Sequence, residues 1–172
     1  MTFVKALLEI TRIKLSRDIE MDYFSLKKTV DAAVNFVEGR AKDKNIIINY
    51  SIEPTVDIIK GAQVYIEETL ANILANSVKY TPQGGRISLD IKDKGQSVLI
   101  RITDTGIGIP KDELRKIFDE FYRAKNAKEV ERAGTGLGLS IAKQVVERHN
   151  GKIWAESEGV GKGAVFFIIL PK

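Results

Sequence analysis

The stretch Asp104-Thr105-Gly106-Ile107-Gly108-Ile109-Pro110 decides how the fold of this chain is interpreted. It follows residues 97–103, where apolar residues alternate with others, so an extended strand ends abruptly at a carboxylate. The two glycines allow a positive φ or a close backbone approach to a bound molecule, which a side chain would oppose by about 1–2 kcal/mol. We therefore expect a turn that presents Asp104 to a small ligand.

Length and composition fit one globular domain. The chain has 172 residues, 44% of them hydrophobic, and a domain of this size buries roughly 70% of the surface of its unfolded chain. It has no cysteine and one histidine, which excludes disulfides and argues against a zinc or haem site made by protein ligands alone. The net charge of +4 comes from 27 basic and 23 acidic residues spread along the chain. This modest excess does not favour nucleic-acid binding and suits an anionic small molecule.

The longest apolar run, residues 164–170, is far shorter than the roughly 20 residues that span a bilayer. The N-terminus also lacks the long apolar segment of a signal peptide. We therefore expect this part of the protein to be soluble, without direct contact with a membrane.

Periodic patterns predict both helices and strands. Apolar alternation or continuous apolar runs predict strands at residues 45–51, 56–59, 86–93, 97–103, 152–157 and 164–170. Helical spacing predicts helices at 3–15, from a cap at Ser25 to about Gly39, at 61–80, at 110–117, and from 134–139 to a cap at Gly151. The last strand is apolar on both faces, which places it inside the sheet. Residues 124–133 are small and charged, and we expect a mobile loop there.

The helix at residues 61–80 has two different faces. At roughly 100° per residue, one stripe is formed by Ile66, Leu70, Ile73, Leu74 and Ser77. A second, polar face is formed by Glu68, Asn72, Asn76 and Lys79. Asparagine is a poor helix former because its amide competes for the backbone, so two asparagines one turn apart indicate a ligand to coordinate. An ordinary solvated face remains the alternative at this point.

The glycine-rich stretch 134–139 opens the next helix. Such a helix start presents free N–H groups and the positive end of the helix dipole, which suits a phosphate. The helix ends near His149, for which we expect a structural role. Together with Asp104 and the polar helix face, this arrangement predicts a nucleotide pocket. The sequence contains neither a P-loop, nor the spacing of a dinucleotide fingerprint, nor the His-Arg-Asp and Asp-Phe-Gly motifs of serine/threonine kinases.

Four motifs resemble the conserved boxes of sensor histidine kinases. Residues 72–82, Asn-Ile-Leu-Ala-Asn-Ser-Val-Lys-Tyr-Thr-Pro, resemble the N box, and residues 104–110 resemble the G1 box. Residues 118–123 resemble the F box and residues 134–139 the G2 box, in the family's order and at compatible separations. The resemblance implies the GHKL-type ATP-binding fold. This is an α/β (α+β) two-layer sandwich whose mixed, mostly antiparallel sheet of about five strands has helices on one face, with a movable ATP lid at about residues 118–135.

The resemblance also implies how the base and the metal are bound. Asp104 would accept a hydrogen bond from the adenine amine, and Gly106 and Gly108 would let the backbone pass the base and the first phosphates. Asn76 would hold Mg²⁺ through its amide oxygen, a ligand suited to a hard cation, with Asn72 beside it.

At the phosphates, the resemblance implies a charged and polar cradle. Lys79 and Arg123 would neutralise phosphate charge and, with Asn72, form the catalytic set. Tyr80 would pack on the nucleotide. The remaining nucleotide contacts would come from Ile109, Thr135, Gly136, Leu137 and Gly138. Phosphoryl transfer depends mainly on positioning and charge compensation, so a site poor in general bases fits it.

One departure from the family pattern matters. The phosphoacceptor histidine of the first dimerisation helix has no counterpart, and His149 falls where the family has a structural helix end. Residues 1–22 would be the tail of a dimerisation helix with its linker, and residues 23–172 the catalytic ATP-binding domain. The γ-phosphoryl of Mg-ATP would pass to a histidine on the dimerisation and phosphotransfer domain of the parent protein, and then to a response regulator. The fragment would be a cytoplasmic monomer that cannot phosphorylate itself.

Other functions remain open on the sequence. GHKL ATPases resembling gyrase, mismatch-repair ATPases or large heat-shock chaperones activate water with a glutamate that aligns with Asn72, and an amide cannot take that proton. A serine protein kinase of the same superfamily and a non-catalytic nucleotide-binding module are further alternatives. Asp-Thr-Gly is also the tripeptide of aspartic proteases, which would use Asp104 in a homodimer. That last interpretation leaves the N box and the glycine-rich helix start unexplained.

Overall fold

The computed structural model describes residues 19–172. The helix expected at 3–15 lies outside the described residues. The strands are β1 (Asp22–Ser25), β2 (Ile47–Ile52), β3 (Ile58–Gly61), β4 (Arg86–Asp93), β5 (Ser97–Asp104), β6 (Lys152–Glu156) and β7 (Ala164–Pro171). The helices are α2 (Leu26–Asp43), α3 (Gln63–Tyr80), α4 (Lys125–Val130) and α5 (Gly138–Arg148), with short 3₁₀ turns η1 (Pro54–Val56) and η2 (Lys116–Phe118).

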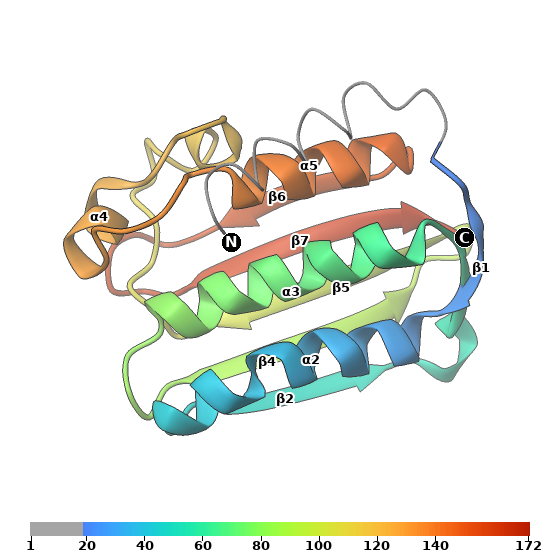
Figure 1. Ribbon diagram of the computed structural model, residues 1–172, viewed down its shortest axis with the longest axis horizontal. Coiled ribbons are helices and arrows are strands. Elements are labelled where there is room, and N and C mark those ends of the chain that lie inside the picture. Colours follow the sequence, from blue (N-terminus) through green and yellow to red (C-terminus); the bar gives the residue numbers. More distant parts are fainter. Residues whose placement is uncertain (1–18) are drawn as a thin grey trace.

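A five-stranded sheet forms one layer of the molecule. Its order is β2-β4-β5-β7-β6, with β2 and β4 parallel and the other neighbouring pairs antiparallel. Helices α2, α3 and α5 lie side by side over one face of this sheet (Figure 1). The expected two-layer sandwich is therefore confirmed, and β7 lies inside the sheet as its apolar pattern predicted.

The hydrophobic core lies between the helices and the sheet. Every second residue of the inner strands is buried, as expected for a sheet with one covered face. The buried set includes Ile87, Leu89 and Ile91 of β4 and Val98, Ile100 and Ile102 of β5. The stripe predicted for α3 belongs to the same cluster: Ile66, Leu70, Ile73 and Leu74. Burying each such side chain contributes about 1.5–3 kcal/mol, so the stripe fixes the rotation of α3 and turns its polar face away from the sheet.

Helix α2 begins where the sequence indicated but ends later. Ser25 caps it, since its Oγ accepts a hydrogen bond from the Lys28 N–H at 3.2 Å. The predicted end near Gly39 was wrong. A glycine inside a helix costs about 1 kcal/mol, and the following buried Ala41 keeps the helix packed on the core. The chain turns only at Asn45, which has a φ of 50°.

Three connections differ from the prediction. The strand expected at 56–59 is divided between η1 and β3, and β3 pairs with the unpredicted β1 in a separate two-stranded sheet. The helix expected at 110–117 is a series of turns ending in η2. The loop expected at 124–133 contains α4. All three segments are short, and tertiary contacts rather than local propensity decide such segments.

Gly151 does not end α5 in the way predicted. The left-handed residue is Asn150, with a φ of 54°, while the Gly151 N–H donates to the Val146 carbonyl at 2.9 Å. A Cβ on Gly151 would lie 2.3 Å from the carbonyl oxygen of Ile169. The glycine therefore permits close packing of the helix end against β7.

Candidate functional site

A cavity of about 850 Å³ opens at one end of the helix layer. The C-terminal ends of α2 and α3 and the N-terminal end of α5 lie at that end, beside α4 (Figure 1). The volume suits a small-molecule ligand. The predicted site residues that line it are Asn72, Asn76, Lys79, Tyr80, Asp104, Gly108, Ile109, Arg123, Thr135, Gly136 and Gly138. Gly106 and Leu137 do not line the cavity.

Asp104, the last residue of β5, is fixed by three hydrogen bonds. Its Oδ1 accepts from the backbone N–H of Gly106 at 2.9 Å and of Ala164 at 3.2 Å. Its Oδ2 accepts from Ser77 Oγ at 3.2 Å. With 6% of the residue exposed, the carboxylate has little freedom to reorient.

The surroundings of Asp104 have opposing effects on its charge. Burial raises the pKa of the Asp104 carboxyl, while the hydrogen bonds from Gly106, Ser77 and Ala164 act to lower it. In each of those hydrogen bonds the carboxylate is the acceptor. A hydrogen bond from a ligand to such a carboxylate is worth about 1.5–3 kcal/mol.

The loop between β6 and β7, residues 157–163, supports the turn that follows Asp104. The Gly161 N–H donates to the Ile107 carbonyl at 2.7 Å, and the Gly163 N–H donates to the Gly106 carbonyl at 3.0 Å. A Cβ on Gly163 would lie 2.1 Å from the carbonyl oxygen of Asp104. The turn and the loop therefore form one closely packed backbone unit.

Gly106 lies behind the cavity wall. A Cβ there would lie 2.7 Å from Asp104 Oδ1 and 2.8 Å from the Tyr80 carbonyl oxygen. Its predicted importance is explained by packing between the end of α3 and the end of β5. The turn is further fixed by Ser157, whose Oγ accepts from the Ile109 N–H at 3.1 Å.

The polar face of α3 borders the cavity, as its sequence predicted. Asn72 and Asn76 both contribute to the wall. A Cβ on Gly138 would lie 2.7 Å from the Asn72 amide, so this glycine lets the start of α5 pack against α3. Lys44 donates from Nζ to the carbonyls of Val78 at 2.8 Å and Lys79 at 3.0 Å. That ammonium offsets the negative end of the α3 dipole beside the cavity.

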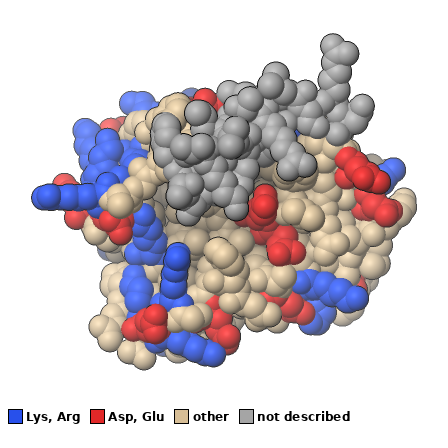
Figure 2. Space-filling model, in the orientation of Figure 1, with Lys and Arg blue, Asp and Glu red and all other residues tan. Residues whose placement is uncertain are grey.

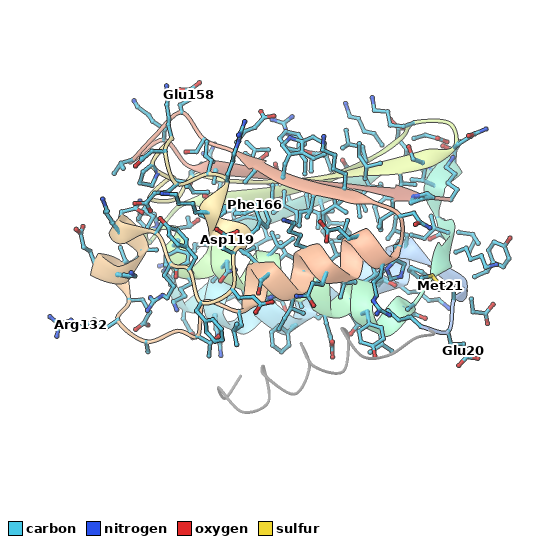
Figure 3. The ribbon with its side chains drawn as sticks, turned by 90° about the horizontal axis from the view of Figure 1, so that it is seen from above. Glu20, Met21, Asp119, Arg132, Glu158 and Phe166 are labelled. Atoms are coloured by element: carbon cyan, nitrogen blue, oxygen red, sulfur yellow. The ribbon has the colours of Figure 1, made fainter. Side chains whose placement is uncertain are left out.

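The two predicted phosphate-binding cations hold three consecutive carbonyl groups, those of residues 131–133. Lys79 Nζ donates to the Ala133 carbonyl at 3.1 Å. Arg123 donates from Nη1 to the Arg132 carbonyl at 2.7 Å and from Nη2 to the Glu131 carbonyl. Burial lowers the pKa of the Lys79 ammonium. The Arg132 side chain itself extends away from the body of the molecule (Figure 3).

Backbone packing also explains the glycine-rich stretch. Gly136 has a φ of 70°, and a Cβ there would lie 2.6 Å from the carbonyl carbon of Phe121. Thr135 Oγ1 accepts from the Leu137 N–H at 3.3 Å. The Leu137 side chain is fully buried in the core and anchors the start of α5.

Basic side chains gather at the end of the molecule where α4 lies (Figure 2). Those that line the cavity are Arg40, Lys44, Lys79 and Arg123. The acidic residues that line it are Asp43, Asp104 and Glu131. The cavity is thus suited to a ligand that is anionic at one end and donates a hydrogen bond to Asp104 at the other.

Sequence reasoning missed several residues of the site. Ser77 lies in the otherwise apolar stripe predicted for α3, and its polar side chain at that position is the available signal. Arg40, Lys44 and Asn126 line the cavity without belonging to any motif, because α2 and α4 approach the site only in the folded chain.

His149 lies away from the cavity and has the structural role expected for it. Its Nε2 accepts from the Ala62 N–H at 2.9 Å, and its Nδ1 lies 2.7 Å from the Val145 carbonyl oxygen. Burial lowers the pKa of the imidazole. Both ring nitrogens are therefore engaged in holding the end of α5 to the start of α3.

The sequence of this chain matches the model of a known protein family. Residues 61–172 match the model of the family described as histidine kinase-, DNA gyrase B-, and HSP90-like ATPase. The chain belongs to this ATPase family. The matched region contains every residue lining the cavity except Arg40, Asp43 and Lys44.

Curated relatives of this ATPase-family chain include sensor kinases. The sensor histidine kinase WalK of Bacillus subtilis (strain 168) is 44% identical over 108 residues, which are 62% of this chain and 18% of that protein. The sensor protein kinase WalK of Staphylococcus epidermidis is 36% identical over 174 residues, covering 98% of this chain and 28% of that protein. The chain thus spans less than a third of the length of these relatives.

Solved structures of the ATPase family share the fold. The catalytic domain of histidine kinase ThkA superposes with a TM-score of 0.78 at 27% identity, covering 90% of this chain and 99% of that chain. Histidine kinase ThkA in complex with response regulator protein TrrA gives a TM-score of 0.80 at 25% identity, covering 98% of this chain and 47% of that chain. The expected GHKL-type fold and the resemblance to histidine kinases are therefore confirmed.

Among residues 19–172, no helix has the length and apolar character needed to cross a membrane.

Proposed function

We propose that this domain binds Mg-ATP in the cavity and supplies its γ-phosphoryl group to a histidine on the dimerisation and phosphotransfer domain of its parent protein. The observation that carries the proposal is the Asp104 carboxylate, buried and held by Gly106, Ala164 and Ser77 at the wall of a cavity that also presents cationic and amide side chains. Similarity to histidine kinase catalytic domains supports the same conclusion.

Asp104 would bind the base. Its carboxylate accepts hydrogen bonds only, so it selects a ligand that offers a donor, such as the exocyclic amine of adenine. The turn from Gly106 to Ile109, fixed from behind by residues 157–163, would hold the base and the first phosphates beside it. Tyr80 lines the same cavity and would pack on the nucleotide.

The phosphate end would be bound by charge and by amide groups. Lys79 and Arg123 would exchange the carbonyl oxygens of residues 131–133 for phosphate oxygens. Free N–H groups at Thr135, Gly136 and Gly138 lie where α5 begins, at the positive end of its dipole. Residues 131–133, together with α4, would belong to the lid expected at about residues 118–135.

The residues of the cavity fit a magnesium ion that is bound largely through phosphate oxygens. In the described part of the chain, no cluster of three or more acidic or histidine side chains could hold a metal by itself. Asn76 offers an amide oxygen, with Asn72 one turn away on the same helix face. Such sites use few protein ligands and several waters. Magnesium there would neutralise charge on the transferred phosphoryl group.

The phosphoacceptor histidine would lie outside these 172 residues. The sequence contains one histidine, and the buried His149 uses both ring nitrogens within the fold. In the transfer, a neutral imidazole nitrogen of the acceptor would form the N–P bond while the bond from the γ-phosphorus to the bridging oxygen of ADP breaks. The protein contributes alignment and charge compensation, which are the main requirements of this chemistry.

A response regulator would receive the phosphoryl group next. ThkA, a histidine kinase of the same fold, has been solved in complex with the response regulator protein TrrA, which supports this order of partners. Use of ATP as donor would place the domain in the cytoplasm.

Titration with ATP, with and without Mg²⁺, followed by incubation with a separately made phosphoacceptor domain tests this function. We expect Mg²⁺-dependent binding and transfer of radiolabelled γ-phosphate to the acceptor histidine. Rapid steady ATP hydrolysis without transfer, or label on His149 of this chain, would contradict the proposal.

A further inference from the structure

Glu113 is a buried acid in the turns between β5 and α4, and the proposed phosphoryl transfer does not use it. It is 2% exposed and does not line the cavity. Its N–H donates to the Pro110 carbonyl at 2.9 Å, and its carbonyl accepts from the Lys116 and Ile117 N–H groups. A buried carboxylate costs free energy unless it is paired or hydrogen-bonded, so the contacts of its side chain indicate its role.

The Glu113 carboxylate holds the start of α4. Its Oε2 accepts a hydrogen bond from the Lys125 N–H at 3.0 Å. Lys125 is the first residue of α4, where the preceding Ala124 provides no side-chain cap and the first turn contains no acid. The first N–H groups of a helix have no partner within the helix, and a negative charge beside them is favourable. Glu113 therefore takes the place of a cap, although it lies 12 residues earlier in the sequence.

The same carboxylate also contacts Tyr122. Burial and a hydrogen bond with Glu113 raise the pKa of the Tyr122 phenol. Arg123 and Ala124 lie between Tyr122 and Lys125 in the sequence. Tyr122, Arg123 and Ala124 all line the cavity. The short segment that brings Arg123 to the cavity is therefore held at both ends by a carboxylate that lies outside the cavity.

The position of this segment determines where the Arg123 side chain can reach. The neighbouring Ala124 is buried in the hydrophobic core, which further limits movement of the backbone at Arg123. The guanidinium lies beside Gly134 of the cavity wall, since a Cβ on Gly134 would lie 3.3 Å from Arg123 Cζ. Ordering a long side chain costs conformational entropy, and a backbone that is already fixed reduces what must be ordered when a ligand binds.

We propose that Glu113 is a positioning residue for the phosphate end of the cavity. Its carboxylate fixes residues 122–125 and thereby holds the Arg123 guanidinium where the phosphates of the nucleotide bind. This role rests on the proposed function and adds to it a residue that touches neither the nucleotide nor the metal. Without the carboxylate, the first turn of α4 and the Tyr122 hydroxyl lose their shared acceptor, and Arg123 is no longer held in place.

The affinities of Mg-ATP and of adenosine for the full chain, measured by NMR titration, test this role. Adenosine has the base that Asp104 would bind but no phosphate, so its affinity reports on the base-binding end alone. Glu113→Ala should weaken ATP about tenfold, as expected when one hydrogen bond to a charged group is lost, and should leave adenosine binding unchanged. Glu113→Gln keeps an oxygen that can accept from the Lys125 N–H, and it should restore most of the ATP affinity.

Asp112→Ala is the matched control, because it removes an exposed acid from the same turn outside the cavity. It should change neither affinity. Glu113→Asp keeps the charge and disturbs the buried packing less than Glu113→Ala, but its side chain is too short to reach both partners. It provides the same measurement if Glu113→Ala does not fold, and ATP should again weaken relative to adenosine.

A double variant separates action through Arg123 from general support of the fold. In an Arg123→Ala background, Glu113→Ala should weaken ATP no further, because the side chain through which it acts is absent. The proposal is overturned if the Glu113 variants leave ATP affinity unchanged, weaken ATP and adenosine equally, or weaken ATP further in that background. Each of these results would leave the proposed ATP binding intact. If the unaltered protein bound neither ATP nor adenosine, the proposed function would fail, and the role of Glu113 with it.

Discussion

A Cβ on Gly108 would lie 2.0 Å from the carbonyl oxygen of Gly159, closer than any real Cβ contact. Gly108 also has a φ of 67°, which disfavours other residues. The turn after Asp104 and the loop between β6 and β7 therefore share a backbone contact that tolerates no side chain. Gly161 provides a comparison, because its φ of 76° is similar but a Cβ there would meet nothing within 4 Å.

Gly108→Ala should destabilise the domain and disrupt nucleotide binding, because both steric overlap and backbone strain are introduced. We expect a loss of about 2–4 kcal/mol in the free energy of unfolding. Gly161→Ala, with strain alone, should lose about 1–2 kcal/mol and keep ATP affinity. Urea denaturation and ATP titration of both variants provide the measurement. Equal effects of the two substitutions would refute the role of the close contact.

Arg123→Ala should release the segment 131–133 in the nucleotide-free protein, because two hydrogen bonds from the guanidinium hold its carbonyl groups. We expect tryptic cleavage after Arg132, whose side chain extends outwards, to become several-fold faster (Figure 3). Arg101→Ala, at an exposed position in the middle of β5, should leave that rate unchanged. An unaltered cleavage rate in Arg123→Ala would show that this contact does not order the lid.

His149 should make the fold sensitive to mild acid. Its pKa is lowered by burial from the usual value of 6.5, so its contribution to stability is present above pH 6.5 and is lost as the pH falls towards the folded-state pKa. Protonation of Nε2 would also remove the acceptor for the Ala62 N–H.

His149→Gln is the variant that isolates this effect. It should cost about 1–3 kcal/mol at pH 7.5, because a buried hydrogen bond is lost, yet its stability should change little between pH 7.5 and 5.5. Thermal melting across this range compares it with the unaltered chain. If both proteins lost stability in parallel as the pH fell, another group would be responsible.

Asp104 should have the opposite pH dependence. Burial raises the pKa of its carboxyl above the usual 3.8, so the folded chain binds this proton more tightly than the unfolded chain. The stabilisation of the fold by this proton is complete below pH 3.8 and is lost as the pH rises through the folded-state pKa. The asparagine of Asp104→Asn carries no charge. Its amide oxygen can still accept the hydrogen bonds from the Gly106 and Ala164 N–H groups, and its NH₂ group can donate a hydrogen bond to Ser77 Oγ.

We therefore expect Asp104→Asn to be about 1 kcal/mol more stable than the unaltered chain at pH 7 without nucleotide. The advantage should shrink as the pH falls towards 4. Urea denaturation at several pH values checks this. A variant less stable than the unaltered chain at pH 7 would mean that the hydrogen bonds of Asp104 outweigh its burial.

The fold and much of the cavity wall could be predicted because the decisive signals are local. The apolar stripe on α3 fixes which face of this helix is buried, and the remaining face must then carry Asn72 and Asn76 to the site. The strand that ends at Asp104 and the glycine-rich start of α5 also carry their signal in a few consecutive residues. Each of these signals lies within one element of the sequence.

Other parts of the site depend on contacts between distant segments, which no local pattern reveals. Lys44 donates hydrogen bonds to carbonyl groups at the end of α3 that lie 34 and 35 residues further along the sequence. Ser157 accepts a hydrogen bond from the N–H of Ile109, which lies 48 residues earlier. The role of Gly138 is explained by Asn72 on another helix. The short α4 and the turns after Pro110 have too few residues for a periodic signal, so their structure follows from packing.

Calorimetric titration of Mg-ATP into the unaltered chain and into Asp104→Asn measures whether this cavity binds ATP through the Asp104 carboxylate. We expect the variant to bind about tenfold to a hundredfold more weakly, because a hydrogen bond to a charged group, worth about 1.5–3 kcal/mol, is lost. Equal affinity of the two proteins would contradict it.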